Sequence, residues 1–291
     1  MNTSLLAPAA LLELRRTLSG QLSTADQPVY EHLRKVWNAA VDVSPSLIVQ
    51  ADAAHAVRFA RAQNLRLAVR SGCHRLWHRG RRVLVDLSKM KGVDLGPETH
   101  HVRLESGLTW GEVAALMHPN GLALTAGNVA TVGVGGMTQG GGIGWMIRRH
   151  GLTIDRLKAV ELITVGGQIV RASLSEHPEL FWGVRSSGAT FRILTALEFE
   201  AHEGGMVYGG LLAFDGPNPA GLLAEYTPLS LEAPEDLTTE AMLMLAPPMP
   251  FLPPRRWAVR CCWFWPVSAA PSGRAKLRSG HCAAWAPRWL T

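Results

Sequence analysis

The sequence predicts an α+β fold, and three observations favour this class. Segments with helical spacing alternate irregularly with short β-branched strands. Several strands are joined by turns short enough for hairpins, such as the Gly166-Gly167 pair within residues 160–173. The chain has 291 residues, of which 47% are apolar and 18% are charged, so it can bury a large core. A doubly wound parallel sheet is the less favoured alternative.

The first part of the chain contains two expected helices followed by three expected strands. Residues 28–38 and 51–64 show the spacing of amphipathic helices. The apolar run at residues 65–72 predicts a strand that ends in a turn. Further strands are expected at residues 83–90 and 100–107, where apolar residues dominate or alternate with polar ones.

The next elements have clear sequence boundaries. Thr109 and Glu112 have the spacing of a capping box before an apolar run, and Gly121 is the expected stop of that helix. After the hairpin comes a short helix with Pro178 in its first turn. Residues 193–201 then predict another strand.

Beyond residue 204 the pattern predicts a strand at 208–216, a helix at 219–237 and a strand at 238–248. This order indicates the start of a second domain that the remaining length does not finish. Three tryptophans lie in amphipathic or packed segments and are therefore expected in the core rather than in a substrate site: Trp110, Trp145 and Trp182.

A glycine-rich segment at residues 126–145 is the strongest indication of a ligand. Such a density of glycine costs chain entropy and supplies no side chains to a core, but it lets the backbone approach a ligand closely. Exposed amides in such turns bind phosphate without a basic side chain. The interleaved Val, Met, Ile and Trp residues argue against a flexible linker. The spacing matches neither the dinucleotide-binding G-x-G-x-x-G turn nor the P-loop. The densest part contains Gly133, Gly135, Gly136, Gly140, Gly141, Gly142 and Gly144.

Five segments together resemble a known family. They are "AVRSGCH", "VLVDLSKMKGV", "GLTWGEVAALMHPNGLAL", "TVGVGGMTQGGGIGWMIRRHGLTIDRL" and "ASLSEHPELFWGVRSSG". In this order they resemble the FAD-linked oxidoreductases of the vanillyl-alcohol oxidase superfamily, with the PCMH-type FAD-binding domain, and most closely the berberine-bridge-enzyme-like branch. The resemblance extends over residues 28–254. It implies that FAD lies between two α+β subdomains and that a further α+β domain covers the flavin ring with the substrate.

The resemblance also implies which residues contact FAD. The family's R-S-G-G-H turn, which holds the pyrophosphate side, corresponds to Arg70, Ser71, Gly72, Cys73 and His74. The family's histidine is commonly bonded to the flavin 8α-methyl, so FAD held covalently through His74 is expected. The glycine-rich segment and one later residue contribute the remaining expected contacts: Val132, Gly133, Gly136, Met137, Gly141, Gly142 and Ile193.

Two further functional features are not expected. Val129 stands where some relatives have a second, cysteinyl link to FAD, so no such link is predicted. The cysteines Cys73, Cys261, Cys262 and Cys282 have the spacing of neither a disulfide framework nor a zinc site, and no metal is expected. No carboxylate, Tyr or His lies in a motif that would assign it as the catalytic base.

Charge and hydropathy limit the classes of partner. The net charge is +6, but residues 255–291 alone hold six Arg and one Lys without any Asp or Glu. The rest of the chain is nearly neutral, so a nucleic-acid surface is not expected. No apolar run approaches the length of a membrane span, and no signal peptide is evident, so a cytoplasmic protein without a membrane partner is expected.

Two segments depart from the family pattern. Residues 73–82 and 255–291 share Arg, Trp, His and Cys, and the second segment adds Pro and Ala, a composition typical of GC-rich coding sequence translated out of frame. Arg192 also replaces a family glycine. We therefore hypothesise a short frame change in the first segment and an unrestored one from about residue 255. The domain organisation expected from this is an N-terminal extension (1–27), a two-subdomain FAD-binding domain divided near residue 95 (28–204), a partial substrate domain (205–254) and a basic tail containing Trp and Cys (255–291).

The predicted function is that of an FAD-dependent oxidoreductase. A hydride would pass from an alcohol, amine or sugar-like small molecule to flavin N5, with molecular oxygen as the acceptor. The alternative is a truncated, non-catalytic remnant of such an enzyme that binds FAD weakly or not at all. A third possibility, nucleic-acid binding through residues 255–291, is the least favoured because the rest of the chain is neutral.

Overall fold

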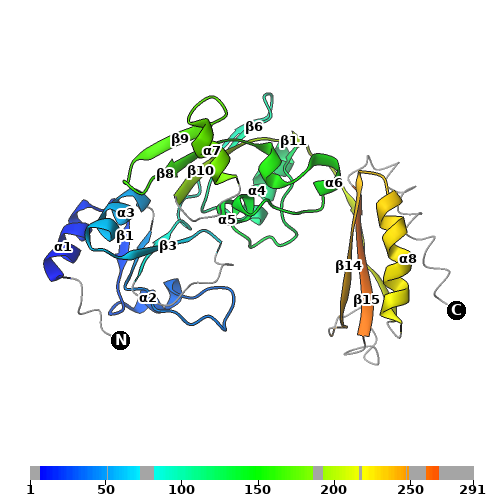
Figure 1. Cartoon of the computed structure of the whole chain (residues 1–291), viewed down its shortest axis with the longest axis horizontal. Coiled ribbons are helices and arrows are strands. Elements are labelled where there is room, and N and C mark those ends of the chain that lie inside the picture. Colours follow the sequence, from blue (N-terminus) through cyan, green and yellow to red (C-terminus); the bar gives the residue numbers. More distant parts are fainter. Residues whose placement is uncertain are drawn as a thin grey trace. The chain divides into compact units, whose positions relative to one another are not determined.

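The computed structural model describes residues 7–50, 52–72, 82–185, 193–215, 218–246, 248 and 260–268 (Figure 1). The chain forms two compact units. The first unit contains Met1–Ile143 and Leu152–Glu203, and the second contains Gly144–Gly151 and Gly204–Thr291. Both units combine helices with sheets, so the predicted α+β class is confirmed.

The first sheet of the first unit is mixed. Its strands, in spatial order, are β1 (Gln21–Ser23), β2 (Leu47–Gln50), β4 (Arg82–Asp86) and β3 (Arg66–Arg70). Strands β2 and β3 each run parallel to β4, and β1 is antiparallel to β2. Helices α1 (Pro8–Thr17) and α3 (Ala53–Ala62) share one core with one face of this sheet, where Leu14, Val57 and Val83 meet. On the other face, Tyr30 of α2 (Pro28–Leu33) packs with Ile48.

The second sheet is entirely antiparallel. Its strands, in spatial order, are β5 (Val93–Gly96), β6 (His101–Glu105), β10 (Ile193–Glu200), β8 (Leu157–Ile163) and β9 (Ile169–Ser173). Helices α4 (Trp110–Met117), α5 (Val134–Gln139) and α7 (Pro178–Val184) bury their apolar side chains against one face, which forms the largest core of the protein. Shorter elements follow the helices: η1 (His118–Asn120), β7 (Leu122–Ala123), η2 (Thr153–Arg156) and β11 (His202–Glu203), with β11 paired to β7.

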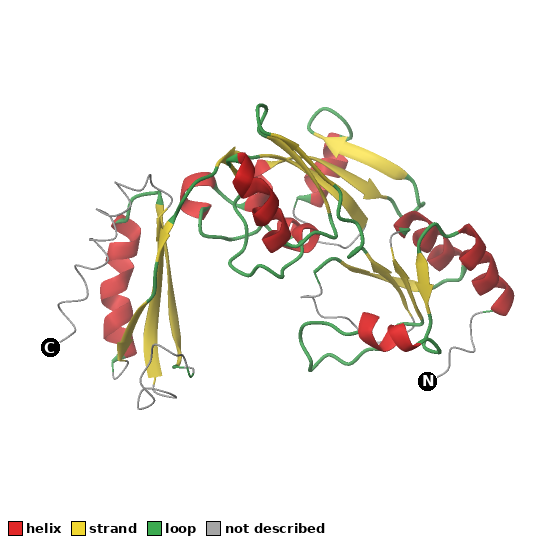
Figure 2. Ribbon diagram, turned by 180° about the vertical axis from the view of Figure 1, so that it is seen from behind, coloured by secondary structure: helices red, strands yellow, loops and turns green. Residues whose placement is uncertain are grey.

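The second unit contains one sheet and one long helix. Its strands are β12 (Tyr208–Gly209), β13 (Leu212–Asp215), β14 (Leu237–Leu245) and β15 (Arg260–Ser268), and β15 pairs antiparallel with each of the other three. Helix α8 (Pro219–Glu232) lies along these strands (Figure 2), and its Leu222 and Tyr226 pack with Phe214 of β13. The unit also contains α6 (Ile147–His150). Strand β15 lies within residues 255–291, which the sequence predicts to be a basic tail.

Most local predictions are confirmed. The Thr109 hydroxyl accepts a hydrogen bond from the Glu112 N–H (3.4 Å) while the Glu112 carboxylate accepts one from the Thr109 N–H (2.7 Å), which completes the capping box. Gly121 has a left-handed φ of 66°, as expected of a helix stop. The hairpin β8–β9 and its turn glycine Gly167, with φ 77°, also occur as predicted. Pro178 is the first residue of α7.

Two expectations were wrong in detail. The helix expected at residues 28–38 ends at Leu33. Trp182 was expected in the core, but its side chain is 72% exposed, whereas Trp110 is buried as predicted. The neighbours of Trp182 in α7, Phe181 and Val184, point into the core. Successive helical residues point about 100° apart, so Trp182 lies on the solvent side of the same short helix.

Two features are absent from the described ranges. No helix among them is both long enough and apolar enough to cross a bilayer. Likewise, within the part of the chain that the structure describes, no group of three or more His, Cys, Asp or Glu residues is arranged so that it could hold a metal ion.

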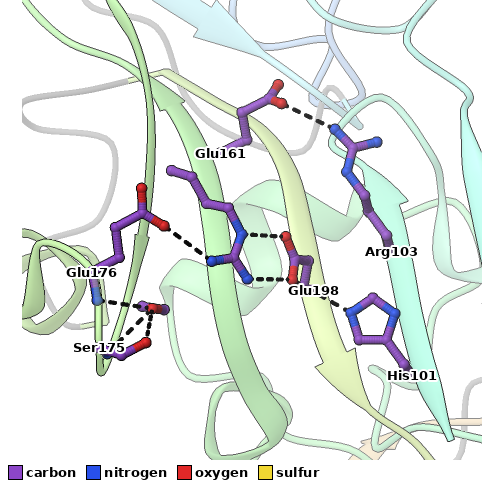
Figure 3. Close-up of polar contacts among 8 residues, drawn as sticks. His101, Arg103, Glu161, Ser175, Glu176 and Glu198 are labelled. Atoms are coloured by element: carbon purple, nitrogen blue, oxygen red, sulfur yellow. Dashed lines mark hydrogen bonds and ion pairs between the residues drawn. The ribbon is translucent and has the colours of Figure 1, made fainter. Parts of the chain in front are cut away.

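The face of the second sheet opposite the core carries a network of ion pairs (Figure 3). The Arg171 guanidinium donates two hydrogen bonds to the Glu198 carboxylate (2.9 and 2.8 Å) and a third to Glu176 (3.1 Å). His101 lies 3.4 Å from the same Glu198 carboxylate. Hydrogen bonds from Arg171 hold the pKa of Glu198 below its ordinary value, although partial burial opposes this. These contacts join β6, β10 and β9 across the sheet.

We expect Glu198→Gln to lower the free energy of unfolding by about 1 kcal/mol near neutral pH, because it removes the charge of a bidentate pair. The lowered pKa means that the contribution of Glu198 is complete above the ordinary glutamate pKa of about 4.3 and is lost as the pH falls through the value in the folded protein. Denaturant unfolding of both proteins between neutral and acidic pH measures this, and the two curves should converge in acid.

The matched control is Glu176→Gln, which removes the charge of a carboxylate that accepts a single hydrogen bond from the same arginine and is 49% exposed. Its effect should be smaller than that of Glu198→Gln. A difference between Glu198→Gln and the parent that stays constant with pH would show that the carboxylate charge is not what stabilises the sheet.

Candidate functional site

The two turns that the sequence assigns separately to FAD lie against each other. Arg70 is the last residue of β3, and Ser71 and Gly72 form the turn that follows. A Cβ atom on Gly72 would lie 2.6 Å from the Cα of Gly133, and one on Gly133 would lie 2.8 Å from the Cα of Gly72. No side chain fits at either position. The Ser71 hydroxyl also donates a hydrogen bond to the carbonyl of Ser106, which ties the first turn to the second sheet.

Main-chain hydrogen bonds hold the second turn in place. The Trp110 N–H donates to the carbonyl of Val132 (3.0 Å), and the Val134 N–H donates to the carbonyl of Leu108 (2.9 Å). Gly133 therefore lies between two residues that are bonded to the chain at the start of α4. Because α4 is itself anchored in the large core, these two main-chain bonds fix the position of Gly133.

Helix α5 presents glycine both to the core and to open space. A Cβ on Gly135 would meet the hydroxyl of Ser106 at 3.0 Å, whereas a Cβ on Gly136 would have no heavy atom within 4 Å. Within the described part of the chain, the N–H groups of these two residues donate to no backbone carbonyl, as is usual in a first helical turn. A bare backbone with unpaired amides is what the close approach of a phosphate-containing nucleotide requires.

Gly141 and Gly142 continue this backbone in a left-handed conformation. Their φ angles are 98° and 81°, which residues with side chains rarely adopt. Their carbonyls accept hydrogen bonds from Ile154 and Thr153, each at 3.0 Å. The Thr153 hydroxyl donates to the carbonyl of Thr125 (2.6 Å). The hydroxyl of Thr125 is buried and has no hydrogen-bond partner among the described residues.

The backbone at these positions suits the binding of FAD. The glycines expected to touch the cofactor have three roles. Gly72 and Gly133 allow the two turns to meet, Gly141 and Gly142 adopt left-handed φ angles, and Gly136 faces open space. An orphaned buried hydroxyl at Thr125 lies next to the same loop. The site is built from backbone rather than from charged side chains, as the sequence predicts for a diphosphate.

Other predicted site residues contribute in different ways or lie outside the described ranges. The Met137 side chain lies between Gly127 and Gly142, where a Cβ on either glycine would approach it within 2.7 and 3.1 Å. Ile193 begins β10 and its side chain is buried in the core shared with the first sheet, so only its backbone is available for the predicted contact. Two residues of the first turn lie outside the described residues: Cys73 and His74.

Sequence reasoning missed Asp86, the last residue of β4. It is fully buried and forms an ion pair with Arg70. Burial alone would raise the pKa of Asp86, but the hydrogen bond and charge of Arg70, together with the Ser88 N–H, hold it below the ordinary value. The available signal was an aspartate that ends an apolar strand, at a position where an unpaired charge would be costly.

The chain is similar to known FAD-linked proteins. Residues 49–173 match the family model described as an FAD binding domain. The chain is 34% identical over 198 residues to the uncharacterized FAD-linked oxidoreductase YgaK of Bacillus subtilis, a match that covers 63% of this chain and 44% of YgaK. The chain spans about half the length of the relatives it matches.

Two solved structures show the same fold. The crystal structure of 6-hydroxy-D-nicotine oxidase from Arthrobacter nicotinovorans has a TM-score of 0.81 and 22% identity, and the match covers 91% of this chain and 58% of that one. Xylooligosaccharide oxidase from Myceliophthora thermophila, in complex with xylobiose, also has a TM-score of 0.81 and 22% identity, over 94% of this chain and 59% of that one.

The contact between the turns predicts opposite outcomes for two glycine substitutions. Gly72→Ala places a methyl group into the backbone of Gly133 and should lower the free energy of unfolding by about 3 kcal/mol. Gly136→Ala meets no neighbour, and alanine is the better helix former, so stability should stay the same or rise by about 0.5–1 kcal/mol. Denaturant unfolding measures both changes.

Affinity for FAD separates the two roles further. If Gly136 lines the cofactor, Gly136→Ala should weaken FAD binding in a titration followed by flavin fluorescence, although the protein is as stable as the parent. Binding of FAD by Gly136→Ala that equals that of the parent would exclude Gly136 from the site.

Proposed function

We propose that this chain, which is a relative of the FAD-linked oxidoreductases of the berberine-bridge-enzyme-like type and has the PCMH-type FAD-binding fold, holds FAD and oxidises a small organic donor. The observation that carries the proposal is the contact between Gly72 and Gly133, which brings the turn after β3 against the turn before α5 within the matched domain.

The chain's own residues would hold the diphosphate through backbone amides. The first turn would offer the amides of Ser71 and Gly72, and the start of α5 would offer those of Gly135 and Gly136. Backbone donors at a helix start carry partial positive charge and fit an anion without a competing counter-ion. Bound FAD would supply a two-electron acceptor, and the protein would supply orientation and a dry site.

The donor we propose is an alcohol, an amine or a sugar-like molecule. Such a donor gives up a hydride from carbon and a proton from O–H or N–H, which leaves a C=O or C=N bond. Molecular oxygen takes up the two electrons and two protons and becomes hydrogen peroxide. The names of the relatives support this range, because one solved structure of this fold is a nicotine oxidase and another is an oligosaccharide oxidase.

We also propose that His74 binds FAD covalently. The new bond joins an imidazole nitrogen to the 8α carbon and replaces one N–H and one C–H bond. The two protons and two electrons released pass to molecular oxygen, which becomes hydrogen peroxide. The support is the resemblance of the Arg70–His74 turn to the family motif, in which a histidine occupies this position.

The test of FAD binding uses the purified full chain. The protein should quench flavin fluorescence on titration with FAD and should turn yellow. After acid precipitation the colour should stay with the pellet, whereas His74→Ala should release it to the supernatant. His118→Ala, which changes an exposed histidine in η1, is the matched control and should behave as the parent. A folded parent protein that neither quenches nor colours would refute the proposed function.

Turnover is measured separately. Hydrogen peroxide release, followed by a peroxidase-coupled assay with panels of alcohols, amines and oligosaccharides, should identify the donor class. Turnover with an artificial electron acceptor but not with oxygen would support the oxidoreductase function and exclude oxygen as its acceptor.

A further inference from the structure

Three parallel strands of the first sheet end in polar residues that are buried together. Gln50 is the last residue of β2, Arg70 of β3 and Asp86 of β4, and the strand register aligns both Gln50 and Arg70 with Asp86. Their exposures are 3%, 6% and 0%. In open sheets with parallel strands, ligands bind outside the carboxyl ends of the strands, and this buried polar cluster occupies that edge.

Hydrogen bonds connect the charged groups of the cluster to one another and to nearby backbone. One carboxylate oxygen of Asp86 accepts hydrogen bonds from the Arg70 guanidinium and from the Gln50 side-chain amide (2.8 Å). The other accepts the N–H of Ser88 (3.0 Å). A second guanidinium nitrogen of Arg70 donates to the carbonyls of Leu33, the last residue of α2, and of Lys35. The charge of Arg70 is therefore neutralised inside the protein.

The backbone at the same point is also fixed. The N–H of Leu87, which follows Asp86, donates to the carbonyl of Arg70 (2.8 Å). The ends of β3 and β4 are therefore held together by the Leu87–Arg70 main-chain hydrogen bond and by the Arg70–Asp86 ion pair. The next residues after Arg70 are Ser71 and Gly72, which form the turn that meets Gly133.

Stability alone is a weak reason for such a pair. Burying two charges costs desolvation energy, and an apolar pair of similar size often stabilises a protein as well or better. An apolar pair would not fix the orientation of its side chains, whereas hydrogen bonds between charged groups are directional and do fix it. In this protein the Arg70–Asp86 pair fixes the orientation of the backbone that leads into the Ser71–Gly72 turn.

We propose that Asp86 is a positioning residue for FAD, which holds Arg70 inside the protein and thereby sets the Ser71–Gly72 turn against Gly133. The inference rests on the proposed function. It assigns Arg70 to the support of the turn rather than to the phosphates, because its guanidinium already serves a carboxylate and two carbonyls. The phosphates are then left to backbone amides.

The decisive variant is Asp86→Asn, which removes the charge and keeps the shape. The positioning role predicts that FAD binding weakens by about tenfold or more, because the turn that carries the amides is no longer held. A direct bond from Arg70 to phosphate predicts the opposite, since removal of Asp86 would free the guanidinium and leave binding unchanged or tighter. FAD titration of the full chain shows whether Asp86→Asn weakens or strengthens FAD binding. If Asp86 positions the turn, amide hydrogen exchange of the peptide containing Ser71 and Gly72, measured without FAD, should also become faster in this variant.

Two further variants guard the result. Gln50→Leu keeps the ion pair but removes one hydrogen bond to Asp86, so it should weaken FAD binding by about threefold to fivefold. This variant decides the matter if Asp86→Asn does not fold. Glu198→Gln removes the partner of another arginine, in the second sheet, and should leave FAD affinity at the parent value.

The outcomes separate the two proposals. A folded parent that does not bind FAD overturns the proposed function. A parent that binds FAD, together with folded Asp86→Asn or Gln50→Leu variants that bind it equally well, overturns the positioning role and leaves the function standing.

Discussion

The backbone contact between Gly72 and Gly133 is the constraint on which the candidate site depends. Gly72 follows strand β3 and Gly133 directly precedes helix α5, and a methyl group on either one would overlap the main chain of the other. Their approach therefore sets how closely the two halves of the first unit meet. It also gathers backbone amides from two turns that are far apart in sequence. A diphosphate held in this way needs no charged side chain, which agrees with the nearly neutral charge of the chain before residue 255.

The same kind of ion pair has different consequences in the two sheets. Arg171 and Glu198 lie on the open face of the second sheet, with side chains 45% and 15% exposed, where solvent and salt reduce their attraction. Arg70 and Asp86 lie at the end of parallel strands with side chains 6% and 0% exposed. The exposed pair joins neighbouring strands. The buried pair has few alternative geometries, and it is the one placed directly before a turn of the candidate site.

The second unit shows that neighbours in sequence can belong to different bodies. The glycine-rich segment crosses from the first unit to the second at Gly144 and returns at Leu152. Within the second unit, the Arg148 guanidinium donates to the carbonyls of Ser230 (2.6 Å) and Ala233 (2.5 Å) at the end of α8. A cation at a helix carboxyl end also interacts favourably with the helix dipole. Strand β15 then supplies the pairing partner of the other three strands.

The sequence by itself determined the local features, because they depend on residues within a few positions of each other. The capping box at Thr109, the left-handed stop at Gly121 and the positive φ angles of Gly141 and Gly142 are of this kind. Only the tertiary structure decided that Gly72 meets Gly133, that Asp86 holds Arg70, and that Trp182 faces solvent. These depend on strand order and helix orientation, which arise from burying apolar faces between distant segments. No local pattern encodes that choice.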